Sequence, residues 1–162
     1  MNLSIRKATH KDHRNILSMT KTTVDRCYRD WLGNEVIEKY LASNKLDLYI
    51  DKYLEHTWIL QKNVKSVAYT ICVENMIEFM LVDVDYQRLG IGTELLKISE
   101  DMLFDNYSTI SLESFKYNIK ANSFLSINGW NSINEYMDPS MNTYKTIFIK
   151  KDKGLDKKRI AI

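Results

Sequence analysis

Three runs of strand-forming residues follow one another between residues 57 and 84, and this succession limits the fold more than any other feature. The runs are TWILQK, KSVAYTICV and MIEFMLVDV, and short polar turns separate them. Their β-branched and aromatic residues favour strands, and turns this short suit antiparallel hairpins. The segment therefore predicts an antiparallel meander.

The spacing of apolar residues changes directly after the meander. Ile91, Leu95, Ile98 and Met102 share one face of a helix that we expect to end near residue 106. Two of the chain's five glycines lie at the junction, within the stretch QRLGIGTELL at residues 87–96. The sequence therefore predicts a strand, a glycine-containing turn and a helix in immediate succession.

The rest of the chain adds strands and helices on both sides of this unit. Thr9 is a suitable helix cap, Gly129 suits the left-handed residue after a helix, and segment 44–56 is ambiguous. The expected elements are strands at 3–8, 108–114, 130–138 and 143–151, and helices at 10–28, 34–43 and 118–128. The order β-α-α-β-β-β-α-β-α-β-β predicts an α/β fold of the α+β type. It has a mixed, mostly antiparallel central sheet with helices on both faces.

Length and composition favour one domain. A chain of 162 residues with 44% hydrophobic content suffices for one core, so we expect a single domain over residues 1–150 and a basic tail over 151–162. There is no run of eighteen apolar residues and no secretory leader, which predicts a cytoplasmic protein without a membrane partner. Cys27 and Cys72 lack CxxC spacing, and His10 and His13 lack a third ligand, so we expect no disulfide and no metal.

Charge argues against a nucleic-acid partner. The formal net charge is +2, and residues 150–162 hold six Lys or Arg against two Asp, a local excess of +4 that leaves −2 for the rest. A short basic tail on a mildly acidic domain is more typical of a solvated terminus than of a binding surface. We therefore expect nucleic-acid binding to be unlikely.

The glycine turn has the chemistry of a phosphate site. The first N–H groups of a helix have no intrahelical partner, and the helix dipole adds partial positive charge there. Gly90 and Gly92 let the backbone turn sharply and let phosphate oxygens approach. No Lys-Ser/Thr pair follows as in a P-loop, and Leu95 stands where a Rossmann motif has its third glycine.

The turn resembles the Q/R-x-x-G-x-G/A motif of the GNAT superfamily of N-acetyltransferases. The match is Gln87-Arg88-Leu89-Gly90-Ile91-Gly92, within MLVDVDYQRLGIGTELL, where Val84 replaces the usual proline. A second block of that family, N-x-x-A-x-x-F-(Y)-x-x-x-G-F, is similar to residues 118–130 at the same spacings. In element order the resemblance covers residues 3–150.

The resemblance implies acetyl-CoA as cosubstrate. The strand before the turn would hold the pantetheine arm, the turn would hold the pyrophosphate, and the helix at 118–128 would contact the lower arm. The implied contacts are Leu81, Val82, Val84, Gln87, Arg88, Leu89, Gly90, Ile91, Gly92, Thr93, Asn118 and Phe124. Core packing is an equally good reading of Phe124.

Glu78 is the candidate general base. Strand alternation places Ile77, Phe79 and Leu81 on one face and Glu78 on the other, in an otherwise apolar run. Many members of the resembling family carry a glutamate base on this strand, and a base must take the proton of the ammonium acceptor. The alternative is that Glu78 lies near the strand's start and simply reaches solvent.

One position departs from the family. Leu125 stands where the second block usually has a tyrosine, which is credited with protonating the departing thiolate. Tyr117 or Tyr136 could substitute, water could suffice, or catalysis could have been lost. The function expected is acetyl transfer to a primary amine of a small molecule, peptide or protein by a monomer or homodimer. The alternatives are a non-catalytic acyl-CoA sensor and an acetyltransferase acting on aminoacyl-tRNA.

The acceptor would approach the segment between residues 23 and 55, as the resemblance implies. Aromatic and acidic side chains there would suit a cationic amine. They are Asp25, Tyr28, Asp30, Trp31, Glu35, Glu38 and Asp47. Ordinary helix surface explains the same residues.

Overall fold

The computed structural model describes residues 2–154, so the last eight residues of the expected basic tail lie outside the described residues. The chain forms two compact units, which are described separately. The first unit contains residues 1–72 and 79–97, and the second contains residues 73–78 and 98–162. The prediction of a single domain over residues 1–150 stays a prediction.

Seven strands form a sheet of the order β1-β2-β3-β4-β5-β7-β6. Their bounds are β1 Leu3–Lys7, β2 Thr57–Lys62, β3 Lys65–Val73, β4 Met76–Val82, β5 Thr109–Phe115, β6 Asn131–Asp138 and β7 Thr143–Lys151. β4 and β5 are parallel, whereas β1 with β2, β2 with β3, β5 with β7 and β6 with β7 are antiparallel. The predicted mixed, mostly antiparallel sheet is confirmed.

Six α-helices accompany the strands in the described part of the chain. Their bounds are α1 His13–Cys27, α2 Arg29–Leu32, α3 Asn34–Ala42, α4 Lys45–Tyr53, α5 Ile91–Phe104 and α6 Ile119–Ile127. Thr9 caps a short 3-10 turn, His10–Asp12, that precedes α1, and Gly129 follows α6 with a φ of 83° as expected. The sequence did not predict α2 or α4.

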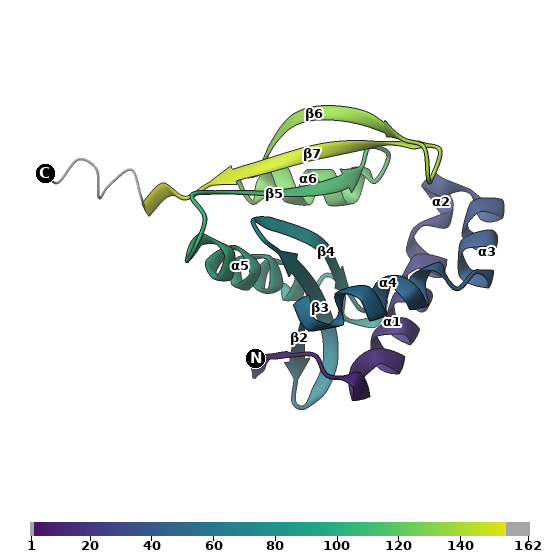
Figure 1. Cartoon of the computed structure of the whole chain (residues 1–162), viewed down its shortest axis with the longest axis horizontal. Coiled ribbons are helices and arrows are strands. Elements are labelled where there is room, and N and C mark those ends of the chain that lie inside the picture. The colour runs from purple at the N-terminus through teal and green to yellow at the C-terminus, as the bar shows by residue number, and fades with distance from the viewer. Residues whose placement is uncertain (1, 155–162) are drawn as a thin grey trace, which may run out of the picture. The chain divides into compact units, whose positions relative to one another are not determined.

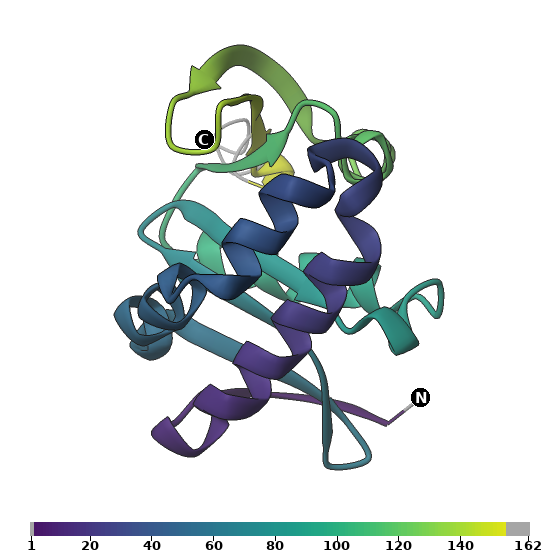
Figure 2. The same cartoon turned by 90° about the vertical axis from the view of Figure 1, so that its right-hand side faces the viewer.

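In the first unit, α1 and α3 lie on the same side of strands β2 and β3 (Figure 1, Figure 2). Ile16 of α1, Ile37 of α3 and Ile50 of α4 are buried. The buried apolar residues of β2 and β3 are Ile59, Leu60, Val67, Ala68, Tyr69 and Ile71. The hydroxyl of Tyr69 lies 2.7 Å from Thr20 Oγ1, so the one polar group of this large buried ring has a partner.

In the second unit, α6 lies along one side of β5 and β7 (Figure 1). Leu125 of α6 and Phe148 of β7 are buried, and Trp130 follows α6 into the core. The Trp130 indole N–H donates to Glu100 Oε1 of α5 at 2.8 Å, and Lys150 Nζ lies 2.7 Å from Glu100 Oε2. This buried carboxylate therefore has a partner at each oxygen.

Candidate functional site

The strand β4 leads into a turn at residues 83–93, which we call the 83–93 turn. Asp83 begins it by accepting the backbone N–H of Asp85 on its carboxylate at 3.0 Å, and the Tyr86 N–H donates to the Asp83 carbonyl at 2.8 Å. These bonds form a 3-10 turn at Val84–Tyr86, where the resembling family has a proline. Side-chain capping by Asp83 thus supplies the bend that proline's fixed φ would favour.

The turn then reverses through two left-handed residues. Arg88 has a φ of 63° and Gly90 a φ of 80°, and α5 begins at Ile91. Such a conformation is uncommon for arginine. Residues 87–90 are exposed, whereas Ile91 is buried. The free N–H groups of the first turn of α5 therefore begin next to an exposed, sharply turned backbone, which is the geometry of an anion site.

The side chains around the turn differ in solvent exposure. Leu81 is buried, Val82 and Val84 are half-buried, and Leu89 and Thr93 are exposed. Gln87 Nε2 donates to the Val82 carbonyl at 3.2 Å and lies 3.9 Å from Cys27 Sγ of α1. The predicted contacts from residue 81 to residue 93 therefore lie together in the first unit.

Glu78 lies on β4 in the second unit and is half-buried, as are Phe79 and Met80. Ile77 and Leu81 are buried, and Ile77 pairs with Leu112 of the parallel strand β5. The partial burial of Glu78 fits both readings, the general base and a side chain that reaches solvent near the start of the strand.

Several residues of the second family block have structural roles in the fold. Asn118 is the N-cap of α6, and its Oδ1 accepts the Ala121 N–H at 3.2 Å. In α6, Leu125 is buried with 4% of its surface exposed, whereas Ala121 and Phe124 are half-buried. Contacts of Asn118 and Phe124 with a cofactor stay predictions.

A family model of the acetyltransferase (GNAT) family matches residues 23–130. The chain belongs to this family. The match contains the whole 83–93 turn and both predicted motifs. A comparison with curated protein sequences found no match.

Solved structures of GNAT proteins share the fold. A GCN5-related N-acetyltransferase from Rhodopseudomonas palustris is 14% identical, with 94% of this chain and 97% of that chain covered and a TM-score of 0.80. The PaiA N-acetyltransferase of Thermoplasma acidophilum, in complex with coenzyme A, is 17% identical over 94% and 100%, with a TM-score of 0.73. Arabidopsis thaliana Naa50, in complex with the bisubstrate analogue CoA-Ac-MVNAL, is 17% identical over 94% and 100%, with a TM-score of 0.68.

The tyrosine that many GNAT proteins carry is absent from position 125, and the two possible substitutes differ. Tyr117 is exposed. Tyr136 donates its hydroxyl to Glu113 Oε2 at 2.7 Å, and burial, followed by this bond to Glu113, raises the pKa of Tyr136. A raised pKa makes Tyr136 a weaker acid than a free phenol.

The acidic residues of the expected acceptor region are mostly paired within the first unit. Arg29 forms ion pairs with Asp25 and Glu38, and Lys39 pairs with Glu35 at 2.7 Å. Asp47 lies 3.4 Å from His13 Nε2. Because Asp25, Glu35 and Glu38 already have counter-ions, they attract a cationic amine less than the sequence suggested.

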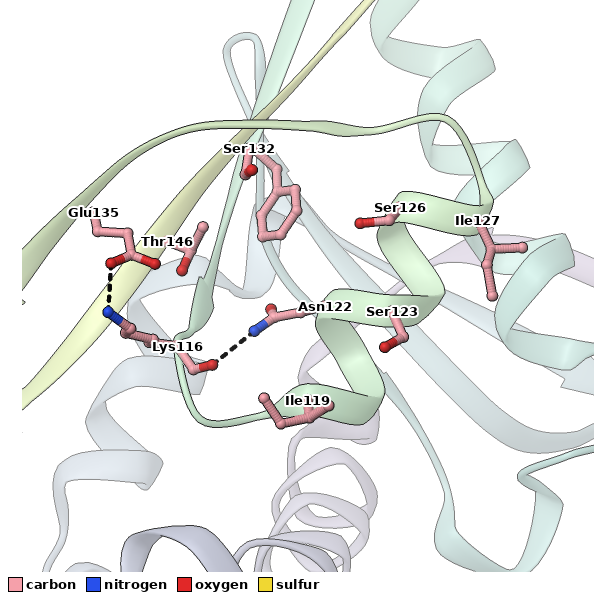
Figure 3. Close-up of a pocket in the computed structure, with 10 residues that line it drawn as sticks. Lys116, Ile119, Asn122, Ser123, Ser126, Ile127, Ser132, Glu135 and Thr146 are labelled. Carbon is pink, nitrogen blue, oxygen red and sulfur yellow. Dashed lines mark hydrogen bonds and ion pairs between the residues drawn. The ribbon is translucent and has the colours of Figure 1, made fainter.

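A groove of about 670 Å³ lies in the second unit between α6 and strands β6 and β7 (Figure 3). At one end Lys116 forms an ion pair with Glu135, and Asn122 donates to the Lys116 carbonyl. Its lining residues are Lys116, Ile119, Asn122, Ser123, Ser126, Ile127, Ser132, Glu135, Thr146 and Phe148. The groove thus contains neither Asn118 nor Phe124.

None of the helices within residues 2–154 is long and apolar enough to cross a membrane. In the same range no cluster of three or more His, Cys, Asp or Glu side chains has an arrangement that would hold a metal ion.

Proposed function

We propose that this protein is an N-acetyltransferase that moves the acetyl group of acetyl-CoA to a primary amine of a small molecule, peptide or protein. The observation that carries the proposal is the 83–93 turn, with left-handed backbone at Arg88 and Gly90 directly before the N-terminus of α5. Two of the similar structures support it, since one is a complex with coenzyme A and the other a complex with the bisubstrate analogue CoA-Ac-MVNAL.

The pyrophosphate of the cosubstrate would lie against residues 87–93. Backbone N–H groups at the start of α5 would donate to its oxygens, and Thr93 would add a hydroxyl. Leu81, Val82 and Val84 would present backbone groups and apolar surface to the pantetheine arm. We place no metal in this reaction.

Glu78 would act as the general base. It would take a proton from the ammonium acceptor, and the neutral amine would attack the thioester carbonyl carbon. A C–N bond forms, and a backbone N–H near Val82 would donate to the resulting oxyanion. The C–S bond then breaks, so the products are the acetylated amine and the CoA thiolate.

No tyrosine is needed for the last step. A thiol has an ordinary pKa of about 8.5, so a thiolate leaves readily and takes its proton from water. Leu125 is buried, so the position of the usual tyrosine is occupied by core packing. A tyrosine introduced there would have to displace its neighbours.

The test is thiol release from acetyl-CoA in the presence of a panel of primary amines. We expect turnover by the wild-type protein, and we expect Glu78→Gln to reduce it by roughly two to four powers of ten, most strongly at low pH. Glu135→Gln is the matched control, because Glu135 is a partly exposed glutamate on β6 that pairs with Lys116. It should leave turnover near the wild-type value.

Two outcomes would contradict the proposal in different ways. If wild-type protein binds CoA but releases no thiol with any amine, the sensor alternative replaces the enzyme. If Glu78→Gln retains the wild-type rate and pH profile, another group is the base.

A further inference from the structure

The 83–93 turn carries more negative charge than an anion site favours. It contains two carboxylates, Asp83 and Asp85, and one guanidinium, Arg88, before α5 begins. A carboxylate close to a bound pyrophosphate raises the free energy of the complex by Coulomb repulsion. A cofactor site at this turn therefore requires positive charge from elsewhere in the first unit.

Two basic side chains outside the turn meet this requirement. Arg26, in the last turn of α1, places Nη1 3.2 Å from Asp85 Oδ1. Lys65, at the start of β3, places Nζ 4.9 Å from the centre of the Tyr86 ring. Hydrogen bonding with Tyr86 is the main cause that raises the pKa of the Lys65 ammonium, and the charges of Asp83 and Asp85 add to it.

The same turn of α1 reaches the motif itself. Cys27, the residue after Arg26, contacts the Gln87 side chain, which also donates to the backbone of Val82. Consecutive residues of α1 thus contact positions 85 and 87 of the turn. An isolated surface ion pair contributes little to stability. The effect expected of Arg26 is therefore on the charge of Asp85 rather than on the stability of the fold.

We propose that Arg26 is a positioning residue of the cofactor site, which neutralises Asp85 so that the 83–93 turn can accept a pyrophosphate. This inference rests on the proposed function. It assigns part of the cofactor site to α1, a helix outside both sequence motifs. Arg26 acts through Asp85 and is not itself a ligand of the cofactor.

The experiment is calorimetric titration of CoA into four proteins, wild type, Arg26→Ala, Asp85→Asn and Arg26→Ala/Asp85→Asn. At an ionic strength of about 0.01 M, Arg26→Ala should bind CoA about three- to tenfold more weakly, because its Asp85 charge is uncompensated. Asp85→Asn should bind at least as tightly as wild type, and the double variant should return to within about twofold of it. Arg26→Lys should restore most of the affinity.

Measurements at high ionic strength and a control variant distinguish an electrostatic role of Arg26 from a structural one. At about 1 M ionic strength the loss in Arg26→Ala should nearly vanish, because exposed charges are screened within a few ångströms. The control is Lys39→Ala, which removes another exposed ion pair of the first unit, and it should bind CoA like wild type. The side chains of Arg26 and Asp85 are 58% and 71% exposed, and those of Lys39 and Glu35 are 76% and 82% exposed.

The outcomes distinguish this inference from the proposed function. Equal affinity of wild type and Arg26→Ala at low salt overturns the inference alone, as does an Asp85→Asn variant that binds as weakly as Arg26→Ala. Absence of CoA binding by the wild-type protein overturns both.

Discussion

The resemblance assigns both sequence motifs to the cofactor, but the two motifs have different surroundings in the structure. The 83–93 turn exposes residues 87–90, holds two left-handed residues and presents a helix start. The segment from Asn118 to Trp130 uses its polar and glycine residues within the fold. Asn118 caps α6, Gly129 ends it with a φ of 83°, and Trp130 is buried with its N–H bonded to Glu100.

The difference shows how a ligand motif can be told from a structural one. In the first motif the left-handed backbone at Arg88 and Gly90 and the first N–H groups of α5 lie beside an exposed surface, where a ligand could reach them. In the second motif the polar groups of Asn118 and Trp130 already have partners that the fold needs. Changes in the first region should therefore alter cofactor affinity, and changes in the second should alter the free energy of unfolding.

The largest effect on stability should come from Lys150→Met. Lys150 and Glu100 are 2.7 Å apart, with side chains only 19% and 11% exposed, so the variant leaves a buried carboxylate without its counter-ion. We expect the free energy of unfolding to fall by about 3 to 5 kcal/mol. Urea unfolding measures it.

The matched control is Lys116→Met in the same unit. Lys116 and Glu135 are 2.6 Å apart, but their side chains are 40% and 45% exposed. Because exposed pairs contribute about 0 to 1 kcal/mol, this variant should unfold almost like wild type. If both variants lost the same free energy of unfolding, burial would not distinguish the two ion pairs. The claim that the buried partners of the second motif stabilise the fold would then be contradicted.

A smaller effect is expected from Asp138→Asn at the end of β6. Hydrogen bonds from Ser140, followed by Lys145, lower the pKa of Asp138 to about 2. A lowered carboxyl pKa stabilises the fold above the unfolded value of about 3.9, and this contribution is lost as pH falls toward 2. The free energy of unfolding of the wild type should therefore be about 2 kcal/mol higher than that of the variant at neutral pH.

The measurement is urea unfolding of both proteins between pH 7 and pH 2. The two stabilities should stay apart above pH 4 and converge below it, since Asp138 then becomes neutral like asparagine. Curves that remain parallel down to pH 2 would show that the Asp138 charge does not stabilise this part of the second unit.

The fold was largely predictable because its strands have clear alternation and its glycines lie at element ends. The segment containing α4 was not, because Leu46, Leu48 and Ile50 alternate like a strand while Leu46, Ile50 and Leu54 also have helical spacing. The structure selects the helix, since Leu46, Ile50 and Leu54 are buried and Leu48 is exposed. The sequence fits strand alternation and helical spacing equally well in this segment, and burial against the rest of the first unit favours the helix.

The site was predictable only where its residues are neighbours in sequence. The 83–93 turn is local, so its glycines and the following helix predict it as a candidate cofactor site. Arg26, by contrast, lies 59 residues before Asp85. Such pairings depend on how distant elements pack, and spacing in one sequence carries no information about them.

The most direct test places the same side chain in both motifs. In Gly92→Asp the carboxylate would lie in the turn proposed to hold the pyrophosphate. Asn118→Asp keeps the cap of α6, because aspartate caps as well as asparagine. Titration of CoA should show affinity reduced at least a hundredfold, about 2.7 kcal/mol, in Gly92→Asp, and less than about tenfold in Asn118→Asp. Wild-type affinity in Gly92→Asp, or an equal loss in both variants, would contradict the assignment of the 83–93 turn as the cofactor site.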